Sequence, residues 1–205
     1  MRVCLEGIGK KFQHEWIFRE VTFTFEENRS YALTGPNGSG KSTLLMTLSA
    51  LVLPSRGTLS YQQGPNSIEH EMVYRHLTLA APYQELIEEF TLRELLEFHF
   101  ELKKPINSLS VGAVAQKLRL EKAYDKYIYQ FSSGMKQRLK LGLALYSESQ
   151  LLLLDEPCTN LDAENTQWYR QEIQEILGKR LVVIASNQKY EYDFCEEVVD
   201  VMRFK

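Results

Sequence analysis

The sequence predicts an α/β fold with a mostly parallel sheet, an antiparallel β edge and an all-helical insert. Two short apolar runs, residues 31–34 and 181–185, are typical of parallel strands buried on both faces. Residues 21–25 alternate apolar and polar side chains, which indicates a half-buried strand. From residue 91 the apolar spacing becomes helical, so a helical block separates two strand-rich portions.

In the first portion, the run at 31–34 stops at a glycine, and residues 41–51 then show apolar spacing typical of a helix. Pro54 lies beyond the expected end of that helix. Residues 57–61 are expected to form another strand, and the QQGPN sequence at 62–66 indicates a turn.

A further strand is expected over residues 77–81, before the helical block. Thr91 and Glu94 have the spacing of a capping box, so a helix is expected over 91–102. Two more helices are expected over 110–119 and 133–146.

The final third returns to alternating strand and helix. Four leucines at 151–154 predict a buried strand, and residues 163–177 predict a helix. The apolar run at 181–185 then completes the β–α–β order, which favours parallel pairing.

The length of 205 residues is expected to form a single domain. We expect residues 1–90 and 146–205 to form its α/β core and residues 91–145 to form a helical subdomain.

Composition excludes several classes of protein. The apolar share of 44% is that of a globular protein, and a net charge of −3 argues against a nucleic-acid partner. Three cysteines without metal-ligand spacing fit a reducing cytosol. No apolar run approaches the roughly 18 residues of a membrane span, and we expect no secretory signal.

Residues 35–42 fit the pattern GxxxxGK[ST] between an expected strand and an expected helix, the context of a phosphate-binding loop. Its backbone N–H groups and the helix N-terminus would face phosphate oxygens. Lys41 would reach the β and γ phosphates, and Ser42 would offer its hydroxyl to Mg²⁺. The expected phosphate-loop residues are Gly35, Pro36, Asn37, Gly38, Ser39, Gly40, Lys41, Ser42 and Thr43.

Two carboxylates follow the leucine run. Asp155 is expected at the carboxyl end of a buried strand, beside the phosphate loop, where it would hold Mg²⁺. Glu156 would orient and deprotonate an attacking water.

Together these motifs resemble the ATP-binding cassette (ABC) family over nearly the whole chain, and in particular a compact, single-cassette ATP-binding subunit. The loop GPNGSGKST is similar to that family's form, FSSGMKQR at 131–138 resembles its signature motif, and TNLD at 159–162 resembles its D-loop. The resemblance implies that two cassettes, most simply two identical ones, pair head to tail around ATP. The residues implied to contact nucleotide from these two motifs are Ser132, Ser133, Gly134 and Asp162.

The adenine contact has two candidates. Phe12 falls where the family places an aromatic ring that stacks on adenine, and Trp16 competes with it. The four histidines lie outside every motif, and we expect surface or core roles for them.

Three positions depart from the family pattern. The signature has Ser133 and Met135 where glycine and glutamine are usual. Asn187 occupies the place of the switch histidine, and an amide can bond to a phosphate oxygen but cannot titrate. Gln84 is the candidate for the family's Q-loop glutamine, one or two positions off register.

The resemblance therefore implies an ATPase that uses ATP and Mg²⁺, with Glu156, Asn187 and Gln84 as catalytic residues and a rate reduced by Asn187. We expect the ATPase subunit of an ABC transporter, peripheral on the cytoplasmic face of the membrane and partnered by a permease on a separate chain. Two alternatives remain: a slowly hydrolysing regulatory subunit, and a soluble ABC protein outside transport.

Overall fold

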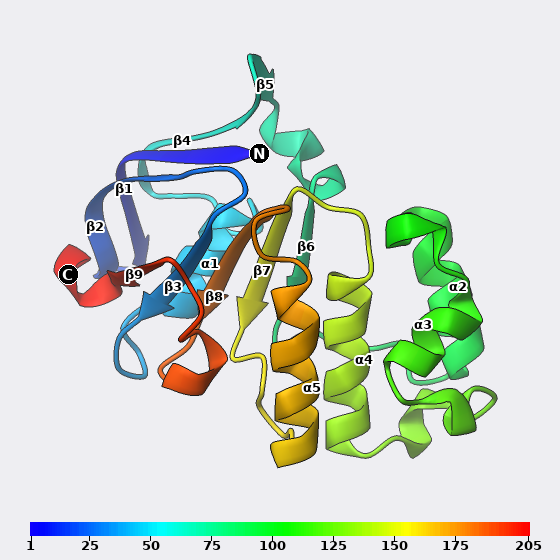
Figure 1. Ribbon diagram of the computed structural model, residues 1–205. Helices are drawn as coiled ribbons and strands as arrows, with labels where there is room; N and C mark the ends of the chain where they lie inside the picture. The colour runs from blue at the N-terminus through cyan, green and yellow to red at the C-terminus, as the bar shows by residue number, and fades with distance from the viewer. The chain divides into compact units, whose positions relative to one another are not determined.

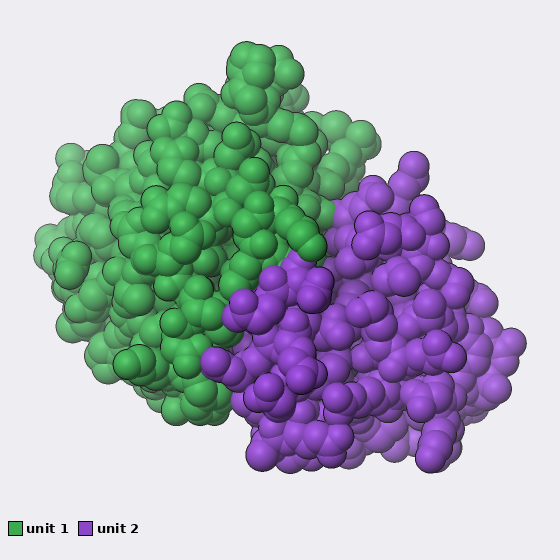
Figure 2. All heavy atoms as spheres, in the orientation of Figure 1, with its two compact units in different colours: residues 1–79, 149–156, 176–205 green, residues 80–148, 157–175 purple.

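A computed structural model describes all residues, 1–205 (Figure 1). The chain forms two compact units. Unit 1 comprises Met1–Leu79, Ser149–Glu156 and Ile176–Lys205. Unit 2 comprises Ala80–Glu148 and Pro157–Glu175, as coloured in Figure 2.

Unit 1 contains the mainly parallel sheet that the sequence predicts. Its five strands run in the order β6-β7-β8-β3-β9, and the pairs β7–β8, β3–β8 and β3–β9 are parallel. A non-sequential order of this kind brings the carboxyl ends of β3, β7 and β8 to one edge. The strands are β3 Ser30–Thr34, β6 Leu77–Ala80, β7 Leu151–Asp155, β8 Leu181–Ala185 and β9 Glu197–Asp200.

The antiparallel strands of unit 1 form a sheet of their own, with the order β2-β1-β4-β5. We expected an antiparallel edge, and the fold class is confirmed with this refinement. Residues 62–66 contain the turn of a hairpin between β4 and β5, because Gln63 pairs with Asn66. The strands are β1 Arg2–Phe12, β2 Glu15–Phe25, β4 Arg56–Gln63 and β5 Asn66–Ile68.

One apolar core joins both sheets to helix α1, which spans Lys41–Leu48 and contacts β7 and β8. Leu5 of β1, Leu44 of α1 and Leu153 of β7 are all buried in it. Burial of apolar surface is the main force that holds the two sheets together, and it stabilises the fold by about 25 cal/mol for each Å² removed from water.

Helix α1 ends three residues earlier than the sequence predicts. Ser49 is its C-cap, and Ala50 has a left-handed φ of 61° that stops the helix. The Ser49 hydroxyl donates to the carbonyl of Met46 at 2.9 Å, which satisfies a carbonyl of the last turn.

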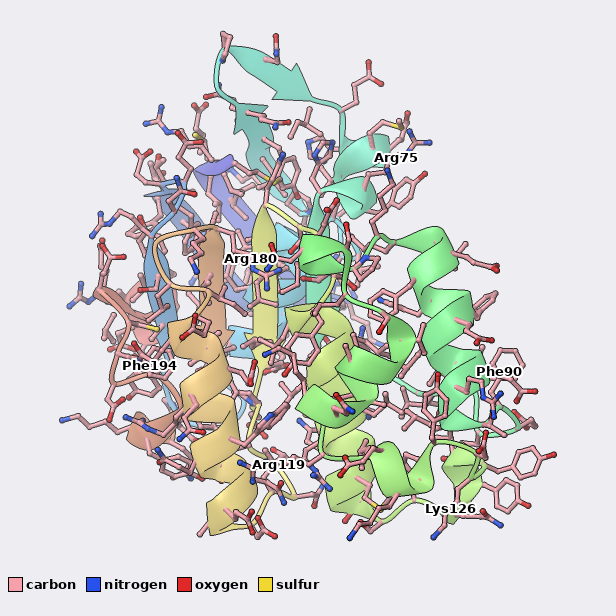
Figure 3. The ribbon with its side chains drawn as sticks, turned by 45° about the vertical axis from the view of Figure 1, so that its right-hand side comes forward. Arg75, Phe90, Arg119, Lys126, Arg180 and Phe194 are labelled. Atoms are coloured by element: carbon pink, nitrogen blue, oxygen red, sulfur yellow. The ribbon has the colours of Figure 1, made fainter.

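Arg180, labelled in Figure 3, precedes β8 at the end of the strand opposite Ala185. It is 7% exposed and donates to the Ser149 hydroxyl at 2.8 Å. Burial lowers the pKa of this guanidinium to about 10.

Unit 2 is helical, as the pattern from residue 91 predicts. Thr91 and Glu94 form the expected capping box on α2, and Ser110 caps α3 through the N–H of Ala113. Helix α5 ends at Gln174, earlier than the expected 177. The helices are α2 Leu92–Leu102, α3 Val111–Lys117, α4 Ser133–Leu145 and α5 Ala163–Gln174.

Two side-chain bonds hold α5 near the end of α3. Trp168 Nε1 donates to the carbonyl of Lys117 at 2.9 Å. Arg119, labelled in Figure 3, donates to Glu164 at 2.7 Å. The structure thus groups residues 157–175 with the helical unit, whereas we expected them in the α/β core. That the whole chain forms one domain remains a prediction.

None of the helices combines the length and the apolar character that crossing a bilayer requires.

Candidate phosphate-binding site

The loop between β3 and α1 is shaped by glycines at its two ends. Gly35 has φ 142° and Gly40 has φ 101°, in the region that favours glycine. A Cβ at Gly35 would lie 2.7 Å from Ser39 Oγ, and one at Gly40 would lie 2.6 Å from Ile17 Cγ2. The pattern GxxxxGK[ST] therefore reflects both backbone angle and close packing at these positions.

Lys41 folds back onto its own loop. Its side chain is 5% exposed, and Nζ donates to the carbonyl oxygens of Gly35 at 2.9 Å and Pro36 at 3.3 Å. These bonds hold the ammonium group at the centre of the loop, where an anion would replace the two carbonyls as its partner.

Asp155 ends β7 and lies beside Ser42. It is 2% exposed, and its Oδ1 has no hydrogen-bond partner. Burial raises the pKa of this carboxyl above its ordinary value, and the negative charge of Glu156 raises it further. The hydrogen bond with the Ser42 hydroxyl and the positive charge of Lys41 both lower the same pKa, but not enough to cancel the rise. An unpartnered buried carboxylate oxygen next to a hydroxyl is a fitting donor set for Mg²⁺, which prefers few protein oxygens and completes its shell with water and phosphate.

Glu156 has a strained backbone. Its φ is 44°, a left-handed value that is uncommon outside glycine, and its N–H donates to the carbonyl of Ala185 at 2.9 Å. This conformation turns the chain after β7 so that Glu156 lines the same pocket as the phosphate loop.

That pocket has a volume of about 330 Å³ and lies entirely in unit 1. It brings Glu156 together with the phosphate loop. Its lining residues are Ile17, Asn37, Gly38, Gly40, Lys41, Ser42, Thr43 and Glu156.

Asn187 also reaches the phosphate loop. It follows β8, and its Nδ2 donates to Oδ1 of Asn37 at 3.1 Å. The structure therefore brings the residue at the switch position next to the loop, as its place in the sequence implies.

The pocket contains one side chain that sequence reasoning missed. Ile17 of β2 lies over Gly40, because the missing Cβ of the glycine leaves room for it. A glycine in the phosphate loop leaves room for a neighbour, but only the folded structure, which places β2 against the loop, identifies that neighbour as Ile17.

The two adenine candidates differ in exposure. Phe12 at the end of β1 is 48% exposed, outside the pocket lining, with Lys10 Nζ 4.9 Å from its ring centre. Trp16 is partly buried, and a Cβ at Gly9 would lie 2.8 Å from its ring. Phe12 is therefore the more accessible of the two rings.

In unit 2 the signature and D-loop segments lie together. Ser132 caps α4 by accepting from the N–H of Met135 at 3.3 Å, and Asp162 caps α5 by accepting from the N–H of Asn165 at 2.8 Å. A Cβ at Gly134 would lie 3.1 Å from the carbonyl oxygen of Asn160. A side chain at 134 would therefore crowd the backbone of residue 160, whereas Ser133 is exposed.

Gln84 lies in a loop of unit 2. Its Oε1 accepts from the N–H of Ala81 at 2.9 Å, which closes a local turn. It lines a second pocket, of about 550 Å³, with acidic and basic side chains. The other lining residues are Pro82, Glu85, Leu86, Glu88, Glu89, Lys136 and Lys140.

A fold with a phosphate-binding loop at the edge of a mainly parallel sheet defines a class of nucleotide-binding proteins. Within that class, residues 18–159 match the model of the family described as "ABC transporter". The chain therefore belongs to the ABC transporter family, which confirms the resemblance drawn from its motifs.

Individual relatives agree with this assignment. The chain is 29% identical over 201 residues to the Nod factor export ATP-binding protein I of Rhizobium sp. (strain N33), covering 96% of this chain and 66% of the relative. It is 30% identical over 206 residues to a sulfate/thiosulfate import ATP-binding protein CysA of Chlorella vulgaris, and the match covers 97% of this chain and 86% of the relative. The chain spans 59–66% of the length of the first Nod factor export relatives that it matches.

The fold is also shared with solved structures. An ABC transporter ATP-binding protein from Pyrococcus furiosus superimposes with a TM-score of 0.82 over 100% of both chains, at 20% identity. A bacterial Atm1-family ABC exporter with ATP bound gives a TM-score of 0.82 over 100% of this chain and 38% of its own, at 18% identity.

Proposed function

We propose that this chain binds MgATP and hydrolyses it as the ATP-binding subunit of an ABC transporter. The main support is in unit 1, where Glu156 lines one pocket with the phosphate loop and buried Asp155 lies beside Ser42 of that loop. The names of the relatives include both export and import proteins, and the proposal covers the ATP-driven step common to both.

Binding would begin with an exchange of partners at Lys41. Its ammonium now donates to Gly35 and Pro36, and it would donate instead to β- and γ-phosphate oxygens. Backbone N–H groups of the loop and the N-terminus of α1 would face the same oxygens. Exposed Phe12 would stack on adenine.

Ser42 and Asp155 would hold Mg²⁺, which when bound supplies positive charge toward the β- and γ-phosphate oxygens. Hydrolysis then needs an aligned water that attacks the γ phosphorus. As that P–O bond forms, the bond to the bridging oxygen of ADP breaks, and Glu156 accepts the proton of the water.

Asn187 and Gln84 would assist this step. The Asn187 amide would donate a hydrogen bond to the γ phosphate without carrying charge, so we expect slower turnover than a histidine supports. Gln84 would help to align the water once its bond to Ala81 opens.

The site would be completed by a second cassette, arranged head to tail. Ser132, Ser133 and Gly134 of that cassette, with its Asp162, would approach the γ phosphate, because a helix N-terminus with small residues admits an anion closely. A permease on a separate chain would hold the pair at the cytoplasmic face of the membrane. The regulatory and non-transport alternatives are not favoured, since the relatives are named as transport proteins.

Calorimetric titration with ATP, in the presence and absence of Mg²⁺, tests the binding step. Lys41→Ala should abolish binding under both conditions, whereas Asp155→Ala should remove only the gain in affinity that Mg²⁺ brings. Equal affinity of wild type and Lys41→Ala would contradict the proposed site.

The transport assignment is tested by purifying the tagged chain from detergent-solubilised membranes. Recovery of a membrane-spanning partner supports the assignment. Recovery of ribosomes or DNA with no such partner would overturn it.

A further inference from the structure

The segment that carries Asn187 is tied at both ends by a buried serine and a buried glutamate. Ser186 is 0% exposed and Glu191 is 2% exposed. The Ser186 hydroxyl donates to Oε2 of Glu191 and accepts from the N–H of Gln188 at 2.9 Å. This hydroxyl therefore donates one hydrogen bond and accepts another within the segment.

One backbone bond anchors the same segment to the sheet, and a second closes the segment on itself. The N–H of Ser186 donates to the carbonyl of Leu33 in β3, two residues before the phosphate loop, at 3.1 Å. The N–H of Glu191 donates to the carbonyl of Gln188 at 2.9 Å. Residues 186–191 thus form a closed loop, which we call the Ser186–Glu191 clamp.

Asn187 is exposed within this clamp and contacts the phosphate loop. Its Nδ2 donates to Oδ1 of Asn37, which lines the pocket. An amide attracts a phosphate by hydrogen bonding alone, and such a bond weakens steeply as distance and angle depart from their optimum. An asparagine at this position consequently depends more on accurate placement than a charged side chain would.

We propose that Glu191 is a positioning residue, which through Ser186 holds Asn187 at the phosphate loop so that its amide can donate to the terminal phosphate of ATP. This inference rests on the proposed ATPase function and adds two residues, Ser186 and Glu191, to the site. Burying a carboxylate is costly unless hydrogen bonds offset it, and a loop that needed only to be stable would be served by apolar packing.

The variants separate positioning from general stability. Ser186→Ala and Glu191→Leu each remove one side of the bond, and Glu191→Gln keeps an acceptor oxygen of similar size. Glu6→Gln, at an exposed glutamate of β1, is the matched control. Comparable unfolding midpoints by calorimetry establish that each variant is folded before its kinetics are compared.

We expect Ser186→Ala and Glu191→Leu to lower kcat for ATP hydrolysis about fivefold to tenfold, roughly the value of one well-aligned hydrogen bond. KM for ATP should change less than about twofold, because the phosphate loop itself is intact. Glu191→Gln and Glu6→Gln should retain kcat within about twofold.

A double-mutant cycle with Asn187→Ala gives the decisive comparison. If the clamp acts through Asn187, Ser186→Ala should change kcat less than about twofold in the Asn187→Ala background. The same loss in both backgrounds, or no loss in either, would overturn the inference while leaving the ATPase function standing.

Absence of turnover in wild type would count against the proposed function instead. The inference is then decided by NMR of the ¹⁵N-labelled chain, because the side-chain amide of Asn187 should shift in Ser186→Ala and remain in place in Glu191→Gln. An Asn187 amide signal that is unchanged in Ser186→Ala would refute the clamp.

Discussion

Replacing Gly40 by alanine should destabilise unit 1 through two separable effects. The backbone at Gly40 has φ 101° and ψ 11°, a conformation that alanine adopts only with strain. Strain of this kind costs about 1–3 kcal/mol.

The second effect is steric. The new Cβ would lie 2.6 Å from Cγ2 of Ile17, and the branched side chain of isoleucine has few rotamers with which to move away. Overpacking of this size costs about 1–3 kcal/mol, so the total expected loss is about 2–6 kcal/mol. Since domains are typically stable by about 5–15 kcal/mol, the loss should be easy to measure.

Urea unfolding of wild type, Gly40→Ala, Ile17→Ala and the double variant tests this reasoning. The double variant should be more stable than the sum of the single losses predicts, by about the steric 1–3 kcal/mol. Gly38→Ala is the matched control, because Gly38 also has a positive φ, 78°, but a Cβ added there would meet no atom within 4 Å. Additive losses at Gly40 and Ile17 would refute the steric part of the reasoning.

Gly142→Ala in α4 should lower the free energy of unfolding by about 1–3 kcal/mol, because the new Cβ would collide with Leu118 Cδ2. The control Gly112→Ala in α3 meets open space and should raise that free energy by up to about 1 kcal/mol. Equal effects of the two substitutions in urea unfolding would contradict this prediction. Burial lowers the pKa of His99 below its ordinary value of 6.5; Lys103 lowers the pKa further, and the hydrogen bond with the Leu143 backbone opposes the shift. Folding therefore favours the neutral ring, and the free energy of unfolding should fall as pH drops below about 6.5. Thermal unfolding should show this loss reduced in His99→Gln and unchanged in His14→Gln, whose ring is exposed; identical pH profiles for all three proteins would disprove it. Phe12→Ala should weaken ATP binding by calorimetry more than Trp16→Ala does, because the Phe12 ring is the more exposed, and the reverse order would reassign the adenine contact.

Much of the fold could be predicted because local pattern and tertiary burial agree. The apolar run at β8 is buried at every residue, and the capping box at Thr91 opens α2 as expected. Strand β9 was missed because its four residues include two carboxylates and only Val199 among them is buried. The separate antiparallel sheet also escaped prediction, since strand pairing depends on contacts distant in sequence.

The residues of the candidate site likewise include some that the sequence predicts and some that only the structure reveals. The phosphate loop, Asp155 and Glu156 could be located because their chemistry requires particular residues at fixed spacing. Ile17 could not, because it reaches the pocket only when β2 packs against the phosphate loop at Gly40 in the folded chain. Glu191 could not either, because a glutamate four residues beyond Asn187 shows its contact with Ser186 only when the loop is folded.

The central claim is that Glu156 completes a site for ATP hydrolysis beside the phosphate loop. Its most direct test is the steady-state release of phosphate from MgATP by wild type and by Glu156→Gln, which retains the shape of the side chain but accepts a proton poorly. We predict measurable turnover in wild type and a loss of about 10²-fold or more in Glu156→Gln, with ATP affinity preserved. Turnover in wild type no greater than in Glu156→Gln would contradict the account.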